Sequence, residues 1–316
     1  MREVLSRGPV RLVLQLLFSG LILLLLVHDV DWSGVLQTLE QGSIKWLIAA
    51  LLFKTLSLLV HETRLWLALP RPRPPVQNVI SLGLAAGVLN LALPARAGDL
   101  AAIAFMEREC KVPVPVGTAA VGVTSFLEAA LFAFFLLAVM GLGAAQWASI
   151  VGDASQAVVW ISAGISLGCL VLGTMALLGK RWEQDPPSPN AFTQLIKQTV
   201  VETSAIVRDV RYLGVQTAAA AAQVVLVVAA FSLAMQASGA GLDNPIAAAS
   251  MVLGIASLAA FVLPPTMAAG PAAASALVLP LFGANESAAL AYAGTYWLVA
   301  HLPAVVMGIP ALMARR

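Results

Sequence analysis

The sequence predicts an all-α fold, a polytopic transmembrane helical bundle, and three observations carry that prediction. Of the 316 residues, 60% are hydrophobic and only 11% are charged. A soluble domain carries about 25% charged residues, so too little polar surface remains to coat a water-soluble globule of this size. The mean hydropathy is +0.90, and many apolar blocks approach the roughly 20 residues that a helix needs to cross a bilayer.

The apolar blocks predict one membrane domain, residues 1–316. We place them at 12–27, 44–69, 78–93, 114–143, 157–179, 214–235, 245–263, 267–282 and 287–313. The first block follows Arg2, Arg7 and Arg11, as in a signal peptide, but no small-residue cleavage site comes after it. We therefore expect an uncleaved first span.

The basic residues between the blocks predict the orientation, because cytoplasmic loops carry an excess of Lys and Arg. The basic segments are the N-terminus, the loop with Arg71 and Arg73, the loop 180–212 and the C-terminal Arg315 and Arg316. The intervening loops carry Asp29, Asp31, Glu40, Asp153 and Asp243. We expect both termini and the loop 180–212 in the cytoplasm.

Residues 78–112 fit this orientation only if they turn around inside the membrane. Basic residues flank the segment on both sides, and its return leg is too short to span. Pro94 breaks a helix and Gly98 permits a turn, so we predict a re-entrant hairpin with its tip at 93–99. Irregular backbone at membrane depth must line a protein-walled or watery cavity.

The second half of the chain repeats this plan. Blocks 245–263 and 267–282 are separated by a segment with Pro264 and Pro265, and Gly270 follows these prolines. If these two blocks form a hairpin that enters the membrane from the opposite side, residues 214–313 are an inverted copy of residues 44–143. Such inverted repeats are typical of transporters whose binding site lies near the midplane of the bilayer. The alternative is two ordinary tilted spans.

Polar residues within the apolar blocks are the candidate site residues. Lys54, Ser57, His61 and Arg64 lie within an arc of about 80° of one helix, and Glu62 lies on the other side of Lys54. Charges at membrane depth are costly and face the protein interior or water. Arg64 lies nearer the cytoplasmic end, so snorkelling to the interface is its alternative.

The first hairpin tip and the following span add further candidates. Asp99 is placed to flank a helix start, and Arg96 offers a planar donor fork that suits phosphate. An Arg96–Asp99 pair that neutralises a buried turn is the alternative. Glu128 lies mid-span, and it can pair with Lys54, pair with Arg96, or carry a proton.

Two other segments have simpler interpretations. Tyr292, Thr295 and Tyr296 share one face of the last block, where packing and interfacial anchoring are favoured over substrate contact. After Asn190, apolar residues follow helical spacing, which predicts an amphipathic helix on the membrane surface. The apolar positions are Phe192, Leu195, Ile196, Val200, Thr203, Val207 and Val210.

Several classes of protein and site are disfavoured. The chain contains no GxSxG, P-loop, HExxH or Rossmann motif. Two cysteines and three histidines are too scattered for a disulfide framework or metal cluster. We expect no cofactor, no metal and no nucleic-acid partner, and we expect the chain not to be an enzyme.

The segment from Asn90 to Leu100, NLALPARAGDL, resembles the signature of the lysylphosphatidylglycerol synthase transmembrane, or flippase-like, family. In the expected order, the motif is followed by the charged stretch 107–111 and by the span containing Glu128. It is preceded by the triplet Arg64-Leu65-Trp66. Two segments depart from the family pattern. The long helix of the family usually begins an E-R-x-x-D motif, of which this chain matches only the last acid, with Glu128. The second hairpin of the family usually carries a Gly-rich turn followed by Glu, which 267–275 lacks.

The resemblance implies a flippase-like lipid transporter in the bacterial cytoplasmic membrane. Its substrate would be an aminoacyl-phospholipid, a glycolipid or an isoprenoid-linked intermediate. Arg96 would engage the lipid phosphate, Lys54 and Arg64 would extend the positive surface, and Asp99 and Glu128 would balance charge or bind a cationic headgroup. Asn90 and His61 complete the expected binding set.

Relatives that also synthesise the lipid add a soluble transferase domain, which we do not expect here. A separately encoded lipid synthase or glycosyltransferase is then a candidate partner, and a homo-oligomer is left open. The alternatives are a secondary transporter of a small soluble solute, a membrane-embedded lipid-modifying enzyme with Glu128 or His61 as acid or base, and a scaffold for a synthase.

Overall fold

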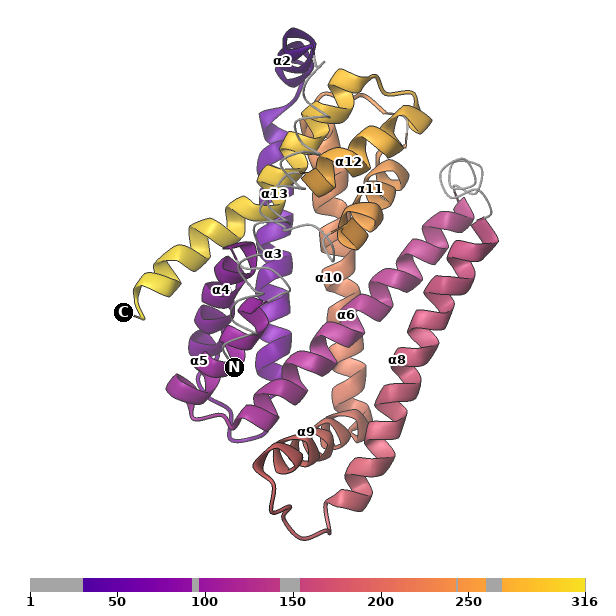
Figure 1. Ribbon diagram of the computed structural model, residues 1–316. Helices are drawn as coiled ribbons and strands as arrows, with labels where there is room; N and C mark the ends of the chain where they lie inside the picture. Colours follow the sequence, from indigo (N-terminus) through magenta and orange to yellow (C-terminus); the bar gives the residue numbers. More distant parts are fainter. Residues whose placement is uncertain (1–30, 93–96, 143–153, 243, 260–268, 316) are drawn as a thin grey trace, which may run out of the picture.

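The computed structural model describes residues 31–92, 97–142, 154–242, 244–259 and 269–315, and all regular elements in these ranges are helical (Figure 1). The helices are α2 (Trp32–Glu40), α3 (Ile44–Ala68), α4 (Val76–Ala92), α5 (Ala97–Cys110), α6 (Val114–Leu142), α8 (Ala154–Trp182), α9 (Ala191–Arg208), α10 (Val210–Ala237), α11 (Pro245–Ala259), α12 (Ala269–Val278), the 3-10 helix η1 (Leu279–Phe282) and α13 (Glu286–Met313).

Five of the described helices are long and apolar enough to cross a membrane. They are α3, α6, α8, α10 and α13. This confirms the predicted all-helical class and the long spans, and most of their ends fall within a few residues of the expected positions. The expected first span, 12–27, lies outside the described residues.

Polar side chains fix where several helices begin. Asp31 accepts a hydrogen bond from the backbone N–H of Ser33, and Asn190 accepts from Phe192 and Thr193. Asp209 and Asn285 cap α10 and α13 in the same way. Such caps satisfy backbone donors that have no partner within the helix, so α2, α9, α10 and α13 each have a defined starting residue.

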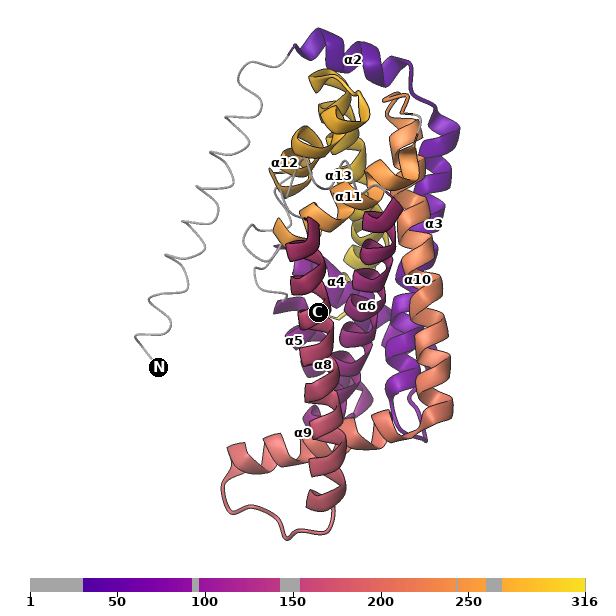
Figure 2. The ribbon, with the colours of Figure 1, turned by 90° about the vertical axis from the view of Figure 1, so that its right-hand side faces the viewer.

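The long helices α3 and α10 pack side by side along much of their length and run in opposite directions (Figures 1 and 2). Helices α6 and α8 form a second antiparallel pair, and α9 lies across the end of the bundle (Figure 2). Helix α9 contacts both α6 and α8. The ends of the long helices therefore define two opposite ends of the molecule.

Four of the charged residues that predicted the orientation lie at opposite ends of the molecule. Arg71, Arg73 and Arg211 share a hollow at the end where α3 finishes and α10 begins. Asp31 lies at the other end, beside Ser287 at the start of α13. The positions of these four residues agree with the predicted orientation, which itself stays a prediction.

Two pairs of short helices, α4 with α5 and α11 with α12, pack between the long ones. The two helices of each pair lie against each other. Of the predicted tip residues, Pro94, Pro264 and Pro265 lie outside the described residues. Gly98 is buried in the first turn of α5 and Gly270 is buried in the first turn of α12. Whether either pair re-enters from one face of a membrane stays a prediction.

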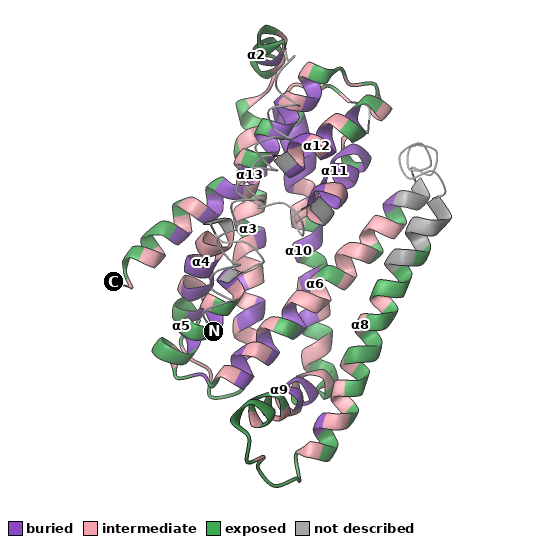
Figure 3. Cartoon of the chain, in the orientation of Figure 1, coloured by how far each residue is buried: buried purple, intermediate pink, exposed green. Residues whose placement is uncertain are grey.

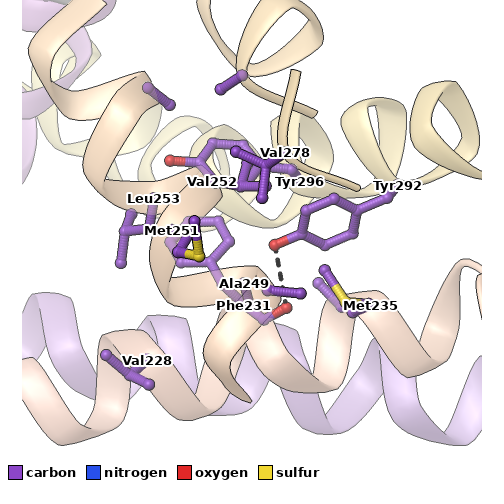
Figure 4. Close-up of a cluster of buried hydrophobic side chains, with 14 of the residues drawn as sticks. Val228, Phe231, Met235, Ala249, Met251, Val252, Leu253, Val278, Tyr292 and Tyr296 are labelled. Atoms are coloured by element: carbon purple, nitrogen blue, oxygen red, sulfur yellow. Dashed lines mark hydrogen bonds between the residues drawn. The ribbon is translucent and has the colours of Figure 1, made fainter. Parts of the chain in front are cut away.

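The larger apolar core lies in the second half of the chain, and Figure 3 shows its buried residues over α10 to α13. Phe231 of α10 stacks on Tyr296 of α13 with ring centroids 4.1 Å apart. Tyr292 donates a 3.3 Å hydrogen bond to the carbonyl of Phe231 (Figure 4). Tyr292 thus packs in the core, as the sequence favoured. A smaller apolar cluster joins α3 to α6 and includes Leu69, Leu82 and Met106.

The predicted amphipathic helix is α9, which begins after Asn190 as expected. Val200 and Thr203 of the predicted stripe are buried, whereas Phe192 and Ile196 stay exposed. Helix α8 continues to Trp182 and α10 already begins at Val210, so both helices extend into the segment 180–212 that was predicted as a loop. Helix α2 was not expected from the sequence.

Candidate functional site

A central cavity of about 450 Å³ lies between the two halves of the chain. Its wall is formed by residues of α3, α4, α5, α6, α10, α11 and α13. Three of the polar residues expected to share a face of α3, namely Lys54, Ser57 and His61, line this cavity. The helical spacing of these residues therefore predicted a real polar face.

Glu128 of α6 faces His61 of α3 across the cavity wall. The Glu128 Oε2 atom lies 2.9 Å from His61 Nδ1, and both side chains are about one third exposed, at 32% and 29%. The Nδ1 atom of His61 also lies 3.5 Å from the Nε2 atom of Gln223. We expected Glu128 to pair with Lys54, to pair with Arg96 or to carry a proton. Its contact with His61 was not among these expectations.

Arg64 lies behind this pair and is fully buried, with 0% of its surface exposed. Its Nη1 donates to Gln223 Oε1 at 2.6 Å and lies 3.6 Å from Glu128 Oε2. Its Nη2 donates to the Thr124 carbonyl at 2.8 Å, and its Nε donates to Gln216 Oε1 at 3.3 Å. Arg64 therefore does not snorkel.

The position of Arg64 differs from the one expected for a substrate contact. Arg64 does not line the cavity, so it is not part of the cavity's positive surface. Its planar guanidinium instead joins α3 to α6 and α10 through bonds in different directions, a geometry that Lys does not offer. Arg64 is placed to hold Glu128 and Gln223 in position.

Gln216 and Gln223 of α10 are the residues that sequence reasoning missed. Gln216 is fully buried, and its Nε2 donates to the Arg64 carbonyl at 2.7 Å and to the Tyr212 hydroxyl. The two glutamines are two helical turns apart in a run of Ala and Val. Residues two turns apart lie on the same face of a helix, and buried polar groups need hydrogen-bond partners. Two amides on one face of an apolar span were therefore the signal that could have identified these residues.

Glu62 projects from α3 toward α4 and is 5% exposed. A Cβ atom on Gly83 of α4 would overlap the Glu62 carboxyl group, so the missing side chain of Gly83 makes room for it. The Oε2 atom of Glu62 is buried without a hydrogen-bond partner in the described part of the chain. Both residues line the cavity.

Asn90 and Asp99, which both line the cavity, join α4 to α5. Asn90 Nδ2 donates to Asp99 Oδ1 at 2.8 Å. A Cβ atom on Gly98 would overlap the Ala86 carbonyl and the Asn90 side chain, so glycine permits this close approach of the two helices. Asp99 lies in the first turn of α5, where a carboxylate complements the helix dipole.

Lys54 and Arg96 were both expected to bind the substrate, but the structure describes only Lys54. Lys54 lines the cavity, and its ammonium group has no hydrogen-bond or ion-pair partner in the described part of the chain. A Lys54–Glu128 pair is therefore not formed. Arg96 lies outside the described residues, and its proposed contacts with phosphate, Asp99 or Glu128 stay predictions.

Most of the remaining cavity wall is apolar and aromatic. Contributing residues are Phe132, Val224, Val227, Phe231, Leu253 and Tyr296. The Lys, His, Glu and Asp residues of the wall thus come from α3 to α6, whereas α10, α11 and α13 contribute mainly apolar and aromatic residues, together with Gln223 and Ser257. No three His, Cys, Asp or Glu residues in the described ranges are grouped so that they hold a metal ion. The arrangement suits a ligand with both a charged and an apolar part.

These features define a class: a multi-pass α-helical membrane protein with a polar cavity inside its bundle. Residues 12–308 match the family model described as the lysylphosphatidylglycerol synthase TM region. The match covers nearly the whole chain, and the protein therefore belongs to this family, as the motif at 90–100 indicated. No curated protein matches the chain.

Proposed function

We propose that this protein moves a polar-headed lipid between the leaflets of the bacterial cytoplasmic membrane. The observation that carries the proposal is the central cavity, whose wall combines ionisable side chains with apolar and aromatic ones. A volume of about 450 Å³ accommodates a headgroup and the first part of an acyl chain. The family to which the chain belongs points in the same direction.

The charges on the wall favour a headgroup with groups of both signs. Lys54 supplies an ammonium group for a phosphate, while Glu62, Asp99 and Glu128 supply carboxyl groups for an amine or hydroxyl groups. Ionisable side chains within a membrane protein are expensive and mark substrate pathways. An aminoacyl-phospholipid, a glycolipid and an isoprenoid-linked intermediate all combine these features.

Pairwise contacts support the inverted repeat that such a transporter would use. Helix α3 packs on α4 as α10 packs on α11, and α5 packs on α6 as α12 packs on α13. Across the halves, α13 contacts α4 as α6 contacts α11. We propose that α4–α5 and α11–α12 are the two re-entrant hairpins, which would place the cavity near the midplane.

The test is mass spectrometry of lipids that remain bound after purification in mild detergent. We expect one anionic or glycosylated lipid class to be enriched over the bulk membrane, and this enrichment to disappear in Lys54→Ala. Lys180→Ala, which removes an exposed charge at the end of α8, is the control. Bulk lipid alone, the same in both variants, would favour transport of a soluble solute instead.

The His61–Glu128 contact favours a second candidate, a membrane-embedded lipid-modifying enzyme. General acid–base catalysis needs two titratable groups within hydrogen-bond reach, and this pair is 2.9 Å apart at the cavity wall. If this candidate holds, purified protein would change the mass of a co-reconstituted lipid, and His61→Ala would abolish the change. Lipid of unchanged mass after incubation excludes it for the lipids tested.

A further inference from the structure

A second polar hollow, of about 590 Å³, lies outside the central cavity. It forms at the basic end of the molecule, where α3 ends, α6 and α10 begin, and α9 finishes. Three arginines line it: Arg71 and Arg73 from the segment after α3, and Arg211 from the first turn of α10. Segments more than a hundred residues apart thus bring three guanidinium groups to one site.

Arg73 is held in place by the end of α3. Its Nε donates to the Leu69 carbonyl and its Nη2 donates to the Leu67 carbonyl, each at 2.9 Å. Its guanidinium carbon lies 5.0 Å from the ring centre of Trp66. Bonds to helix-end carbonyls and to an aromatic face position Arg73 while leaving its positive charge unneutralised.

Arg71 and Arg211 are exposed, and neither makes an ion pair in the described part of the chain. Two carboxyl groups share the hollow, Glu202 and Asp209. Asp209 already accepts a hydrogen bond from the Tyr212 N–H as the cap of α10. Burial raises the pKa of the Glu202 carboxyl, which disfavours its negative charge. The arginines therefore outnumber the carboxyl groups and keep free donors.

Part of the lining of the hollow is apolar. It is formed by Leu67, Ala68, Leu69, Val116, Ile206 and Val215. Helix α9, which contributes Ile206, exposes Phe192 and Ile196 toward its other end. An interfacial helix of this kind lies at the headgroup level of a membrane. The hollow thus combines arginines with an apolar surface, and the predicted place of α9 on the membrane surface would put it at the depth where phosphate groups of lipids are found.

We propose that this hollow binds a phosphate-bearing ligand through Arg71 and Arg211, with Arg73 adding fixed positive charge. Arginine forks match phosphate oxygens in pairs, and such charge-assisted bonds are the stronger kind of hydrogen bond. The phosphate belongs either to a membrane lipid, whose acyl chains would cover the apolar wall, or to a soluble compound. The site is separate from the central cavity and does not depend on what that cavity carries.

The experiment measures equilibrium binding of radiolabelled probes to the full-length protein in detergent. The probes are short-chain phosphatidic acid and inorganic phosphate, with short-chain diacylglycerol as the probe that lacks phosphate. The variant is Arg71→Ala/Arg211→Ala, which leaves the bonds of Arg73 intact. The control is Lys180→Ala/Arg181→Ala, which removes two exposed charges at the same end but outside the hollow.

We expect the Arg71/Arg211 variant to bind phosphatidic acid at least about tenfold more weakly, since two charge-assisted contacts are lost. The control variant should bind as the unchanged protein does, and diacylglycerol should not bind at the site. Saturable binding of phosphatidic acid without phosphate binding identifies a lipid ligand, while comparable binding of phosphate identifies a soluble one.

Three results overturn the proposal. One is the absence of saturable binding of either phosphate-bearing probe. Another is binding that is unchanged in the Arg71/Arg211 variant. The last is an equal loss in the Lys180/Arg181 control, because the effect would then come from the general charge of that end and be screened by salt.

Discussion

The two halves of the bundle share an order of helices but differ in what they enclose. The α10–α13 half packs around Phe231, Tyr292 and Tyr296 with apolar neighbours. The α3–α6 half buries Arg64 and Glu62 and presents His61 and Glu128 to the cavity. The hydrophobic effect that stabilises an apolar core is non-directional, whereas buried charged groups require partners in fixed positions.

This difference shows that the polar half is incomplete by itself. Two of the partners of Arg64, Gln216 and Gln223, come from α10 in the other half. The α10 helix thus contributes apolar residues to its own core and amide groups to its neighbour. The two halves are joined through a hydrogen-bonded network in addition to surface contact, and the following substitutions test that view.

Arg64→Leu should have the largest effect. It removes the guanidinium that satisfies Gln223 Oε1 and the Thr124 carbonyl and lies beside Glu128. Breaking a buried charged network costs roughly 3–5 kcal/mol. We expect a large fall in the thermal unfolding midpoint in detergent. Arg181→Leu, at an exposed position, is the control, and equal effects of the two substitutions would contradict the role of Arg64.

Gly83→Ala should have the next largest effect, because its Cβ atom would overlap the Glu62 carboxyl group. Overpacking of this kind costs about 1–3 kcal/mol. Gly87→Ala is a matched control one turn along the same helix, since nothing lies within 4 Å of its Cβ position. Adding Glu62→Ala should restore most of the lost stability, and additive effects would show that the two residues do not interact.

Gln223→Leu tests the contribution of α10 alone. It leaves Arg64 Nη1 without its 2.6 Å acceptor, and an unsatisfied buried donor costs about 1–3 kcal/mol. Val225→Leu, at an exposed position on the same helix, is the control. Unfolding in detergent measures both, and a Gln223 variant as stable as the control would mean that the halves are not joined through this residue.

Tyr292→Phe should have the smallest effect, because the apolar half depends little on any single polar bond. It removes one 3.3 Å hydrogen bond to the Phe231 carbonyl and keeps the ring. We expect a loss of about 0.5–1.5 kcal/mol, within the range for one hydrogen bond. A loss as large as that of Arg64→Leu would erase the contrast between the two halves.

The sequence predicted the helices better than it predicted the site. Block length located the span at 44–69, and Asn190 marked the start of α9. Helical spacing also predicted that Lys54 and His61 share one face of their helix, and both residues line the cavity. These features are local, and they follow from periodicity and capping alone.

The partners of the site residues were not predictable in the same way. Glu128 pairs with His61, and Arg64 turns away from the cavity toward Gln216 and Gln223. These contacts join residues 67 to 159 positions apart and depend on how α3, α6 and α10 pack. Spacing within one helix carries no information on which neighbouring helix supplies a partner.

The most direct test of the central claim is transbilayer movement of a headgroup-labelled lipid in proteoliposomes, with Lys54→Gln beside the unchanged protein. Lys54 lines the cavity and has no described partner, so its loss should leave the fold intact. The account predicts movement faster than in protein-free vesicles, a fall toward that background in Lys54→Gln, and no change in Lys180→Gln. Movement at the protein-free rate in the unchanged protein, or movement unaffected by Lys54→Gln, would contradict it.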